Sequence, residues 1–517
     1  MYHFLGTSPY FVWCNMKKLL LLSLLFALAL ASCKEEPAVA PTPEPVSEDV
    51  APEDVAPITV SLSLSDTMIV APKGESVSIT CTVNSSDVSE SDVTYQWYSS
   101  SSGSTWFGTL IEGAVSPTLV LEHFTEPGIY YYYCTVKVAG SSSSFTSDVA
   151  SVAYTVLPTV YLNTPGGAPV TSKENWMEGA TISIAGAPDD SWNFSEVFLS
   201  VKGRGNSTWK QPKKPFALKL DKKQSIMGMP KSKRWVLIAN YLDNSFMKNS
   251  MAFFLSRQLG MDYTVRGDFV DLVLNGKYVG LYWFGEAIKV DSDRVNIDED
   301  NDFLIELDNY YDETWKFKSS VKNLPYMIKN DDSMDSSRLD AIKAAVTDLE
   351  TRLYPEEGEP DISKIDIDSF IKFWLVNELM CNSNEIGHPK SCYFTYTVSD
   401  GIFRAGPVWD FDWSTLRLQD SCKCQDKLYY DALFKSCAFK ARVAELWDSY
   451  SASLSVDQEI ERLRTQIKVA SKFDSLLWGI HLDPSKVFRT GFDAYVNFLK
   501  KSLNQKLSVV DSFIQQL

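Results

Sequence analysis

Apolar positions follow two different periods along the 517-residue chain. Between Ile58 and Val156 they alternate with polar positions in short runs such as SVSITCTV and YYYYCTVKV, which is typical of half-buried β-strands. In the C-terminal half they recur at helical spacing. This second period predicts amphipathic helices over residues 337–353, 366–380, 438–451, 457–472 and 492–515.

The middle of the chain predicts a small lobe of strands with one helix. The pair Asn275-Gly276 is the strongest short signal for a β-hairpin. A helix over 240–260 is expected to open at the capping residue Asp243 and to close on Gly260. Strands are expected over residues 234–239, 269–274, 278–284 and 303–307.

A second predicted hairpin follows the polar loop 381–391. Its strands cover 392–398 and 402–409, and the second strand delivers Asp410 and Asp412 at its C-terminal end. Carboxylates at a strand end opposite a polar loop can hold a divalent cation over a phosphate. A hairpin that ends in a hydrogen-bonded Asp turn explains the same residues equally well.

The N-terminus predicts export and lipid attachment. From Met16, which we take as the true start, two lysines precede an apolar run that closes on a lipobox ending in Cys33. The run is shorter than the ~20 residues of a membrane-spanning helix, which favours a signal peptide over residues 1–33. A lipid on Cys33 would hold the chain at the outer membrane or cell surface, through a disordered Pro- and Glu-rich linker over 34–57.

The alternating region carries the markers of an immunoglobulin-like sandwich. Cys81, Trp97 and Cys134 have the order and rough spacing of that fold, and Tyr132 lies where a tyrosine corner falls. The region resembles bacterial Ig-like surface modules, so we expect an all-β immunoglobulin-like domain over residues 58–156. In an exported protein Cys81 and Cys134 are expected to form an inter-sheet disulfide. Spacer and adhesive roles both stay open.

The chain is acidic overall but strongly basic in one stretch. It has 49 Lys and Arg residues against 66 Asp and Glu, a net charge of −17. Between Lys202 and Arg234, however, eleven basic residues accompany a single acid, Asp221. These cations interleave with glycines and the strand FALKL, which favours a turn and strand that bind an anion over a solvated face. The acidic net charge argues against a nucleic-acid partner.

Four sequence blocks stand in a characteristic order. They are RGNSTW at 204–209, KKPFALK at 213–219, NGKYVGLY at 275–282 and GPVWDFD at 406–412. Together they resemble the CotH family of secreted atypical protein kinases, over about residues 157–517. The resemblance implies a kinase-like α+β fold with ATP and Mg²⁺ or Mn²⁺ between a strand-rich and a helical lobe. It also implies that the partner is an extracytoplasmic protein substrate.

The resemblance further implies roles for individual residues. Lys219 would be the strand lysine that pairs with the nucleotide phosphates. Asp410 would hold the metal, with Asp412 and Ser391 in support. Phosphoryl transfer is mostly positioning and charge neutralisation, which these groups can supply. The nucleotide-binding residues would be Arg204, Gly205, Asn206, Lys219 and Glu286.

The catalytic loop departs from the family pattern. Active members carry an aspartate there and an asparagine about five residues later, but residues 382–391 contain no aspartate. Glu385 is the nearest carboxylate and Asn384 the nearest isostere, while the asparagine position falls near Lys390 or Ser391. A displacement of ~1 Å can cost about 100-fold in rate, and glutamate is longer by about one bond. The alternative is therefore a pseudokinase that binds a protein or a glycan at the cell surface.

The remaining candidate sites are weaker. His388 is expected to order its loop rather than to act as a base. The acidic loop 291–302 lacks the spacing of an EF-hand, so a solvated loop is expected. Five cysteines after residue 380 predict one or two disulfides, with the pairing open. They are Cys381, Cys392, Cys422, Cys424 and Cys437.

Overall fold

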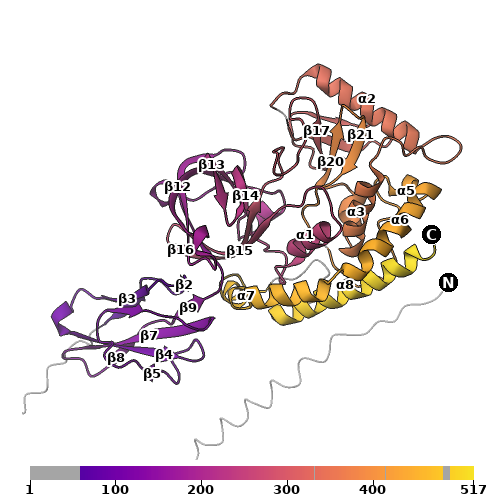
Figure 1. Ribbon diagram of the computed structural model, residues 1–517. Helices are drawn as coiled ribbons and strands as arrows, with labels where there is room; N and C mark the ends of the chain where they lie inside the picture. Colours follow the sequence, from indigo (N-terminus) through magenta and orange to yellow (C-terminus); the bar gives the residue numbers. More distant parts are fainter. Residues whose placement is uncertain (1–58, 331, 414, 481–489) are drawn as a thin grey trace, which may run out of the picture. The chain divides into compact units, whose positions relative to one another are not determined.

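The computed structural model describes residues 59–330, 332–413, 415–480 and 490–517 (Figure 1). The predicted signal peptide, the lipidated Cys33 and the linker over 34–57 lie outside these residues. The chain from Ile58 to Leu517 forms one compact unit. Its described part is mostly β, with several sheets followed by a helix-rich C-terminal part. None of the described helices is long and apolar enough to cross a membrane.

The N-terminal β-rich region consists of two sheets around one core. One sheet has the order β1 (Ser61–Leu64), β3 (Val77–Asn84), β6 (Thr118–Leu121). The other has the order β2 (Met68–Ala71), β9 (Ala150–Tyr154), β7 (Gly128–Val138), β4 (Val93–Ser100), β5 (Thr109–Leu110), with β8 (Ser144–Thr146) beside β7. Trp97 and Tyr132 are buried between apolar side chains of both sheets. The region fits an Ig-like domain loosely.

The cysteines of this core are neighbours but are not bonded to each other. Cys81 lies on β3 and Cys134 on β7, and both are buried as free thiols. Their side chains hydrogen-bond, which lowers the pKa of Cys81. The structure therefore brings the two cysteines of the predicted disulfide together as free thiols, one from each sheet.

The predicted C-terminal disulfides are likewise not formed among the described residues. Cys437 is exposed, and its backbone N–H donates to the Glu359 carboxylate at 3.3 Å. The other members of the group are buried free thiols, namely Cys381, Cys392, Cys422 and Cys424. The one or two disulfides predicted for this group are therefore not present among the described residues.

A closed barrel follows the sandwich. Its strand order is β10 (Thr159–Asn163), β11 (Met177–Ala185), β12 (Phe194–Gly203), β13 (Phe216–Ile226), β14 (Met229–Ile238), β16 (Lys277–Glu286), β15 (Gly267–Leu274). All neighbours are antiparallel except β10 and β15, whose parallel pairing closes the barrel. On β13, Phe216, Leu218 and Leu220 fill the interior, so the alternating Ala217 and Lys219 point outward.

A five-stranded sheet forms the next layer. Its order is β18 (Lys316–Lys318), β19 (Pro325–Ile328), β17 (Phe303–Leu307), β20 (Cys392–Thr397), β21 (Ile402–Ala405). The β20–β21 hairpin confirms the prediction, but its second strand ends at Ala405 instead of residue 409. Pro407 has no N–H with which to continue the ladder. Asp410 therefore lies in a segment beyond the sheet, with a φ of +69°.

The described helices match most of the predicted ones. Asp335, Asp366 and Ser436 each cap one by accepting a hydrogen bond from a backbone N–H of the first turn. The first helix begins at Lys248, eight residues later than predicted, because Asp243 organises a turn before it. The bounds are α1 (Lys248–Gln258), α2 (Ser336–Leu353), α3 (Ile367–Leu379), α4 (Ser383–Gly387), α5 (Tyr430–Leu433), α6 (Cys437–Tyr450), α7 (Val456–Trp478) and α8 (Phe492–Ile514).

The two long C-terminal helices run side by side (Figure 1). Lys500 of α8 pairs with Asp457 and Glu461 of α7 at 3.2 Å each. Near its C-terminal end, α7 also touches the barrel, where the backbone N–H of Leu281 donates to Asp474 at 2.8 Å. This contact attaches the helical part to strand β16 of the barrel.

Candidate functional site

A cavity of about 890 Å³ opens between the barrel and the five-stranded sheet. The barrel contributes the end of β12 and the loop after it, residues 202–208. The sheet contributes side chains of β17 and β19, and the segment after β21 contributes Trp409, Asp410, Asp412 and Trp413. Charges of both signs line the cavity, which suits a polyanion that binds together with a cation.

Asp410 and Asp412 form a carboxylate pair in this cavity. Asp412 is buried and its Oδ1 has no hydrogen-bond partner. Burial, followed by the neighbouring carboxylates of Asp410 and Asp243, raises the pKa of Asp412 to about 8. A divalent cation would neutralise such a pair and use the unpartnered oxygen as a ligand.

The rest of the coordination shell would come from outside this pair. Among the residues that the structure describes, no group of three or more His, Cys, Asp or Glu side chains could hold a metal ion. A cation at Asp410 and Asp412 would therefore complete its shell with water or phosphate oxygens, as Mg²⁺ does in phosphate-binding sites.

The first turn of α1 holds this carboxylate segment in place. Asn249 accepts a hydrogen bond from the Phe411 N–H at 2.7 Å, and Lys248 Nζ donates to the carbonyl of Asp412 at 3.4 Å. From the other side, the Ser391 hydroxyl contacts Asp410 Oδ2 at 3.5 Å. These contacts maintain the left-handed backbone of Asp410, a conformation that costs about 1 kcal/mol or more.

The predicted glycine turn lies opposite, at the end of β12. Arg204 packs its guanidinium over the Trp409 ring, 5.2 Å from the centroid. Burial lowers the pKa of Arg204, and nearby Asp410 opposes that effect. Gly205 has a φ of +77°, and a Cβ there would collide with Thr208, so the turn requires glycine. Together with Asn206 these predicted residues do line the cavity.

The structure does not bring Lys219 to the cavity. Lys219 is exposed on the outer face of β13 and pairs in register with Ser200 and Arg234. Lys202, on the same outer face of the barrel, lines the cavity instead. Its ammonium lies 5.0 Å from the Trp176 ring centroid, and burial lowers its pKa. Of these two strand lysines, the one at the cavity is therefore Lys202 and not the predicted Lys219.

A second lysine reaches the cavity wall but is already paired. Lys213 is fully buried and donates to the carbonyl of Leu281 at 2.6 Å and to the Asp474 carboxylate. Its burial lowers its pKa, and Asp474 opposes that effect. Because Asp474 belongs to α7, this ion pair connects the helical part to the wall of the cavity.

The sheet side of the cavity is acidic. Asp308, directly after β17, accepts hydrogen bonds from the N–H groups of Tyr310 at 2.7 Å and Ser391 at 3.1 Å. Burial raises its pKa to about 6, and the carboxylates of Glu306 and Asp410 contribute. Glu306 itself is paired with Lys329 at 2.9 Å. The sequence predicts the strand 303–307 but carries no signal for a role of the carboxylate that follows it.

The predicted catalytic loop contains a helical turn. Residues of α4 place Glu385 in the cavity wall, where it pairs with Lys390 at 3.3 Å. Burial raises the pKa of Glu385, and Lys390 opposes that effect. Asn384 is exposed and does not line the cavity, and its carbonyl accepts the His388 N–H at 3.1 Å. Of the two predicted catalytic residues, only Glu385 reaches the site.

A family model described as CotH kinase protein matches residues 201–516. The chain belongs to the CotH family. The matched span holds every residue that lines the cavity except Lys173 and Glu174. Membership of the CotH family suggests an atypical kinase-like function and a general dependence on nucleotide and metal.

Other comparisons add little to the CotH match. No curated protein matches the chain. Fibronectin(III)-like modules of Clostridium thermocellum CbhA are similar at 17% identity and a TM-score of 0.17, covering 34% of this chain and 90% of that chain. Three N-terminal domains of the bacteriophage RB49 highly immunogenic outer capsid protein are similar at 11% identity and a TM-score of 0.15. The match covers 34% of this chain and 68% of that chain.

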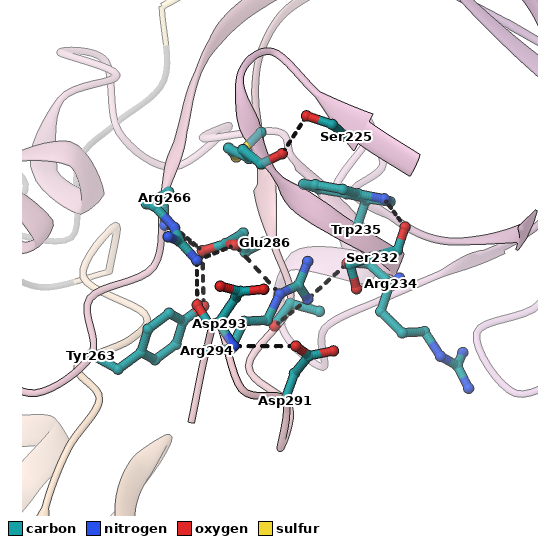
Figure 2. A network of polar contacts seen from close by, with 12 residues as sticks. Ser225, Ser232, Arg234, Trp235, Tyr263, Arg266, Glu286, Asp291, Asp293 and Arg294 are labelled. Carbon is teal, nitrogen blue, oxygen red and sulfur yellow. Dashed lines mark hydrogen bonds and ion pairs between the residues drawn. The ribbon is translucent and has the colours of Figure 1, made fainter. Parts of the chain in front are cut away.

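Glu286, also predicted for nucleotide binding, does not line the cavity of the CotH region. It belongs instead to a network of polar contacts (Figure 2). It is fully buried at the end of β16 and accepts two hydrogen bonds from the Arg266 guanidinium, at 2.9 and 2.8 Å. Arg294 lies 3.4 Å away, and the Tyr263 hydroxyl donates at 3.0 Å. These contacts tie β16 to the chain on both sides of the β15–β16 hairpin, so we correct the role of Glu286 to a structural one.

Proposed function

We propose that this CotH protein is an atypical protein kinase, with ATP and Mg²⁺ or Mn²⁺ bound in the cavity. It would transfer the γ-phosphoryl group of ATP to an extracytoplasmic protein. The observation that carries the proposal is the carboxylate pair Asp410 and Asp412 in the same cavity as the cations Lys202 and Arg204. A triphosphate with its metal ion requires both kinds of group at short range.

Each of these residues has a distinct task in the proposal. Asp410 and Asp412 would hold the divalent cation, which supplies neutralisation of phosphate charge when it is bound. Arg204 would bind phosphate oxygens through two parallel N–H donors, and Lys202 as a point charge. Gly205 would keep the turn that carries Arg204 in its left-handed conformation, in which Thr208 leaves no space for a Cβ.

The proposal extends to the fold and to the place of action. The barrel and the helical part would be the two lobes of a kinase-like α+β fold, with the nucleotide between them. A lipid on Cys33 would keep the protein at the outer membrane or cell surface, where it would meet its substrate. The net charge of −17 argues against nucleic acid as that partner.

One observation favours a second candidate, a catalytically inactive surface module. Glu385 is the loop carboxylate nearest to the expected base, and Lys390 already engages it at 3.3 Å. If no other group accepts the proton, the cavity would bind nucleotide without transfer. The protein would then act by binding a protein or a glycan at the cell surface.

Thermal unfolding of the full chain with ATP tests nucleotide binding. At a ligand concentration of 100 Kd, ATP with Mg²⁺ or Mn²⁺ should stabilise the protein by about 2.7 kcal/mol, a shift of a few degrees. The shift should require the metal and disappear in Asp410→Ala and Arg204→Ala. Asp340→Ala, which changes an exposed carboxylate on α2, should keep it. No shift in the unaltered protein at millimolar ATP would overturn the proposal.

A further inference from the structure

Asp308 enters the cavity from a different element than the catalytic loop. It follows β17 and is 6% exposed. The Tyr310 N–H donates to its Oδ1 and the Ser391 N–H to its Oδ2. Each carboxylate oxygen is thus fixed in direction by a backbone group, and each keeps a lone pair for a further partner.

Ser391 connects Asp308 to the proposed metal site. Its N–H binds Asp308 at 3.1 Å, and its hydroxyl contacts Asp410 at 3.5 Å. A single residue therefore separates the two carboxylates. A hydroxyl that approaches a phosphate held by a cation at Asp410 would enter the stretch of cavity wall that Ser391 and Asp308 also line, which makes Asp308 a candidate base.

Glu385 has a different environment. Its carboxylate is paired with the Lys390 ammonium at 3.3 Å, and both residues come from the same loop. If Glu385 took up a proton, it would lose its ion pair with Lys390, and the free-energy cost is modest because the Lys390 side chain is 37% exposed. The hydrogen bonds of Asp308 come from backbone N–H groups and persist when another partner binds.

We propose that Asp308, and not Glu385, is the catalytic base of the kinase, an inference that rests on the proposed function. The acceptor would be the hydroxyl of a protein side chain. Its oxygen forms a bond to the γ-phosphorus while the bond from that phosphorus to the β,γ-bridging oxygen breaks. ADP leaves with the electron pair of the broken bond, and the proton of the hydroxyl passes to the Asp308 carboxylate. The loop thus needs no aspartate of its own.

The test compares nucleotide binding and phosphoryl transfer on the same preparations of the full chain. Binding is followed by thermal shift with ATP and Mn²⁺. Transfer is followed as the label that passes from γ-labelled ATP to dephosphorylated casein, the acceptor. Free labelled phosphate is counted in the same reactions to detect transfer to water. The variants are Asp308→Asn, Asp308→Glu and Glu385→Gln, and the control is Asp340→Asn.

We expect Asp308→Asn to lower transfer by about 100-fold or more while the thermal shift is retained. Asp308→Glu keeps the charge but moves it by about one bond, so it should also lose about 100-fold. Glu385→Gln should stay within about tenfold, and Asp340→Asn should be unchanged. A large loss in Glu385→Gln with normal transfer in both Asp308 variants would overturn the inference. An unaltered protein that binds ATP yet transfers no phosphate would also overturn the inference. An unaltered protein whose unfolding temperature does not change with ATP would refute the proposed function itself, and that outcome is distinguishable from the first.

Discussion

Lys202 on β12 and Lys219 on β13 lie at different positions relative to the cavity. Both point outward from the barrel, but only Lys202 lies beside the cavity. Lys202→Ala should therefore weaken ATP binding by about 10- to 100-fold, because a charge-assisted hydrogen bond contributes about 1.5–3 kcal/mol. Lys219→Ala, the matched control, should change the affinity by less than about twofold. Isothermal titration calorimetry would measure the ATP affinity of both variants. Equal losses of affinity would refute the placement of Lys202, rather than Lys219, at the nucleotide site.

Asp412 makes cation binding depend on pH. Its pKa is raised from 3.8 to about 8, so between these values the folded state holds a proton that the unfolded state has released. Its contribution to stability is therefore lost as the pH rises from about 4 to about 8. A cation must displace this proton, so the Mn²⁺ affinity should increase by up to about tenfold per pH unit between pH 6 and 8.

A titration of the full chain with Mn²⁺ at pH 6, 7 and 8 would measure this dependence. In Asp412→Asn the affinity should be weak and nearly independent of pH, because the titrating group is removed. An unaltered protein whose Mn²⁺ affinity is the same at all three values would contradict the assignment of Asp412.

Residues of the site were predictable where they are close in sequence. Arg204 and Gly205 belong to one turn, and Asp410 and Asp412 to one segment, so their order alone suggested a phosphate and metal site. Asp308 was missed because it approaches Ser391 only through the pairing of β17 with β20.

At the scale of elements, hairpins and amphipathic helices were predicted well because their signals are local. The Asn275-Gly276 turn and the helical period of α2 lie within single windows of sequence. Barrel closure was not predicted, since it depends on the parallel pairing of β10 with β15, about a hundred residues apart. The short α4 was missed because its apolar pattern is too brief to show a period.

The Glu286 network joins two of these elements and predicts an effect on stability. Glu286→Gln leaves the buried Arg294 and the partly exposed Arg266 without their charge partner, so it should destabilise the protein by about 3–5 kcal/mol, mainly through Arg294. Glu461→Gln, which alters an ion pair of a half-exposed glutamate on α7, should cost less than about 1 kcal/mol. Chemical denaturation would measure both variants.

The same pair of variants separates a structural role of Glu286 from a role in binding. Folded Glu286→Gln should bind ATP as the unaltered protein does, since Glu286 does not line the cavity. If Glu286→Gln kept the normal midpoint of unfolding but lost nucleotide binding, the structural role assigned to Glu286 would be contradicted.

At the scale of the whole molecule, the described sandwich and barrel share contacts within one compact unit. Lys277 of the β15–β16 hairpin pairs with Asp66 at 3.1 Å, and Thr155 donates to the buried Asp271 at 2.6 Å. The predicted domain boundary after residue 156 falls between β9 and β10. The two periods of apolar positions indicated two fold types along the chain, but they could not indicate these contacts, which join residues more than a hundred positions apart.

The most direct test of the central claim is a crystal structure of the full chain with Mn²⁺ and a non-hydrolysable ATP analogue. Anomalous scattering would locate the metal independently of the nucleotide. We expect a manganese peak between Asp410 and Asp412, with phosphate oxygens beside Lys202 and Arg204. A nucleotide bound elsewhere, or a cavity that stays free of both ligands at saturating concentration, would contradict the account.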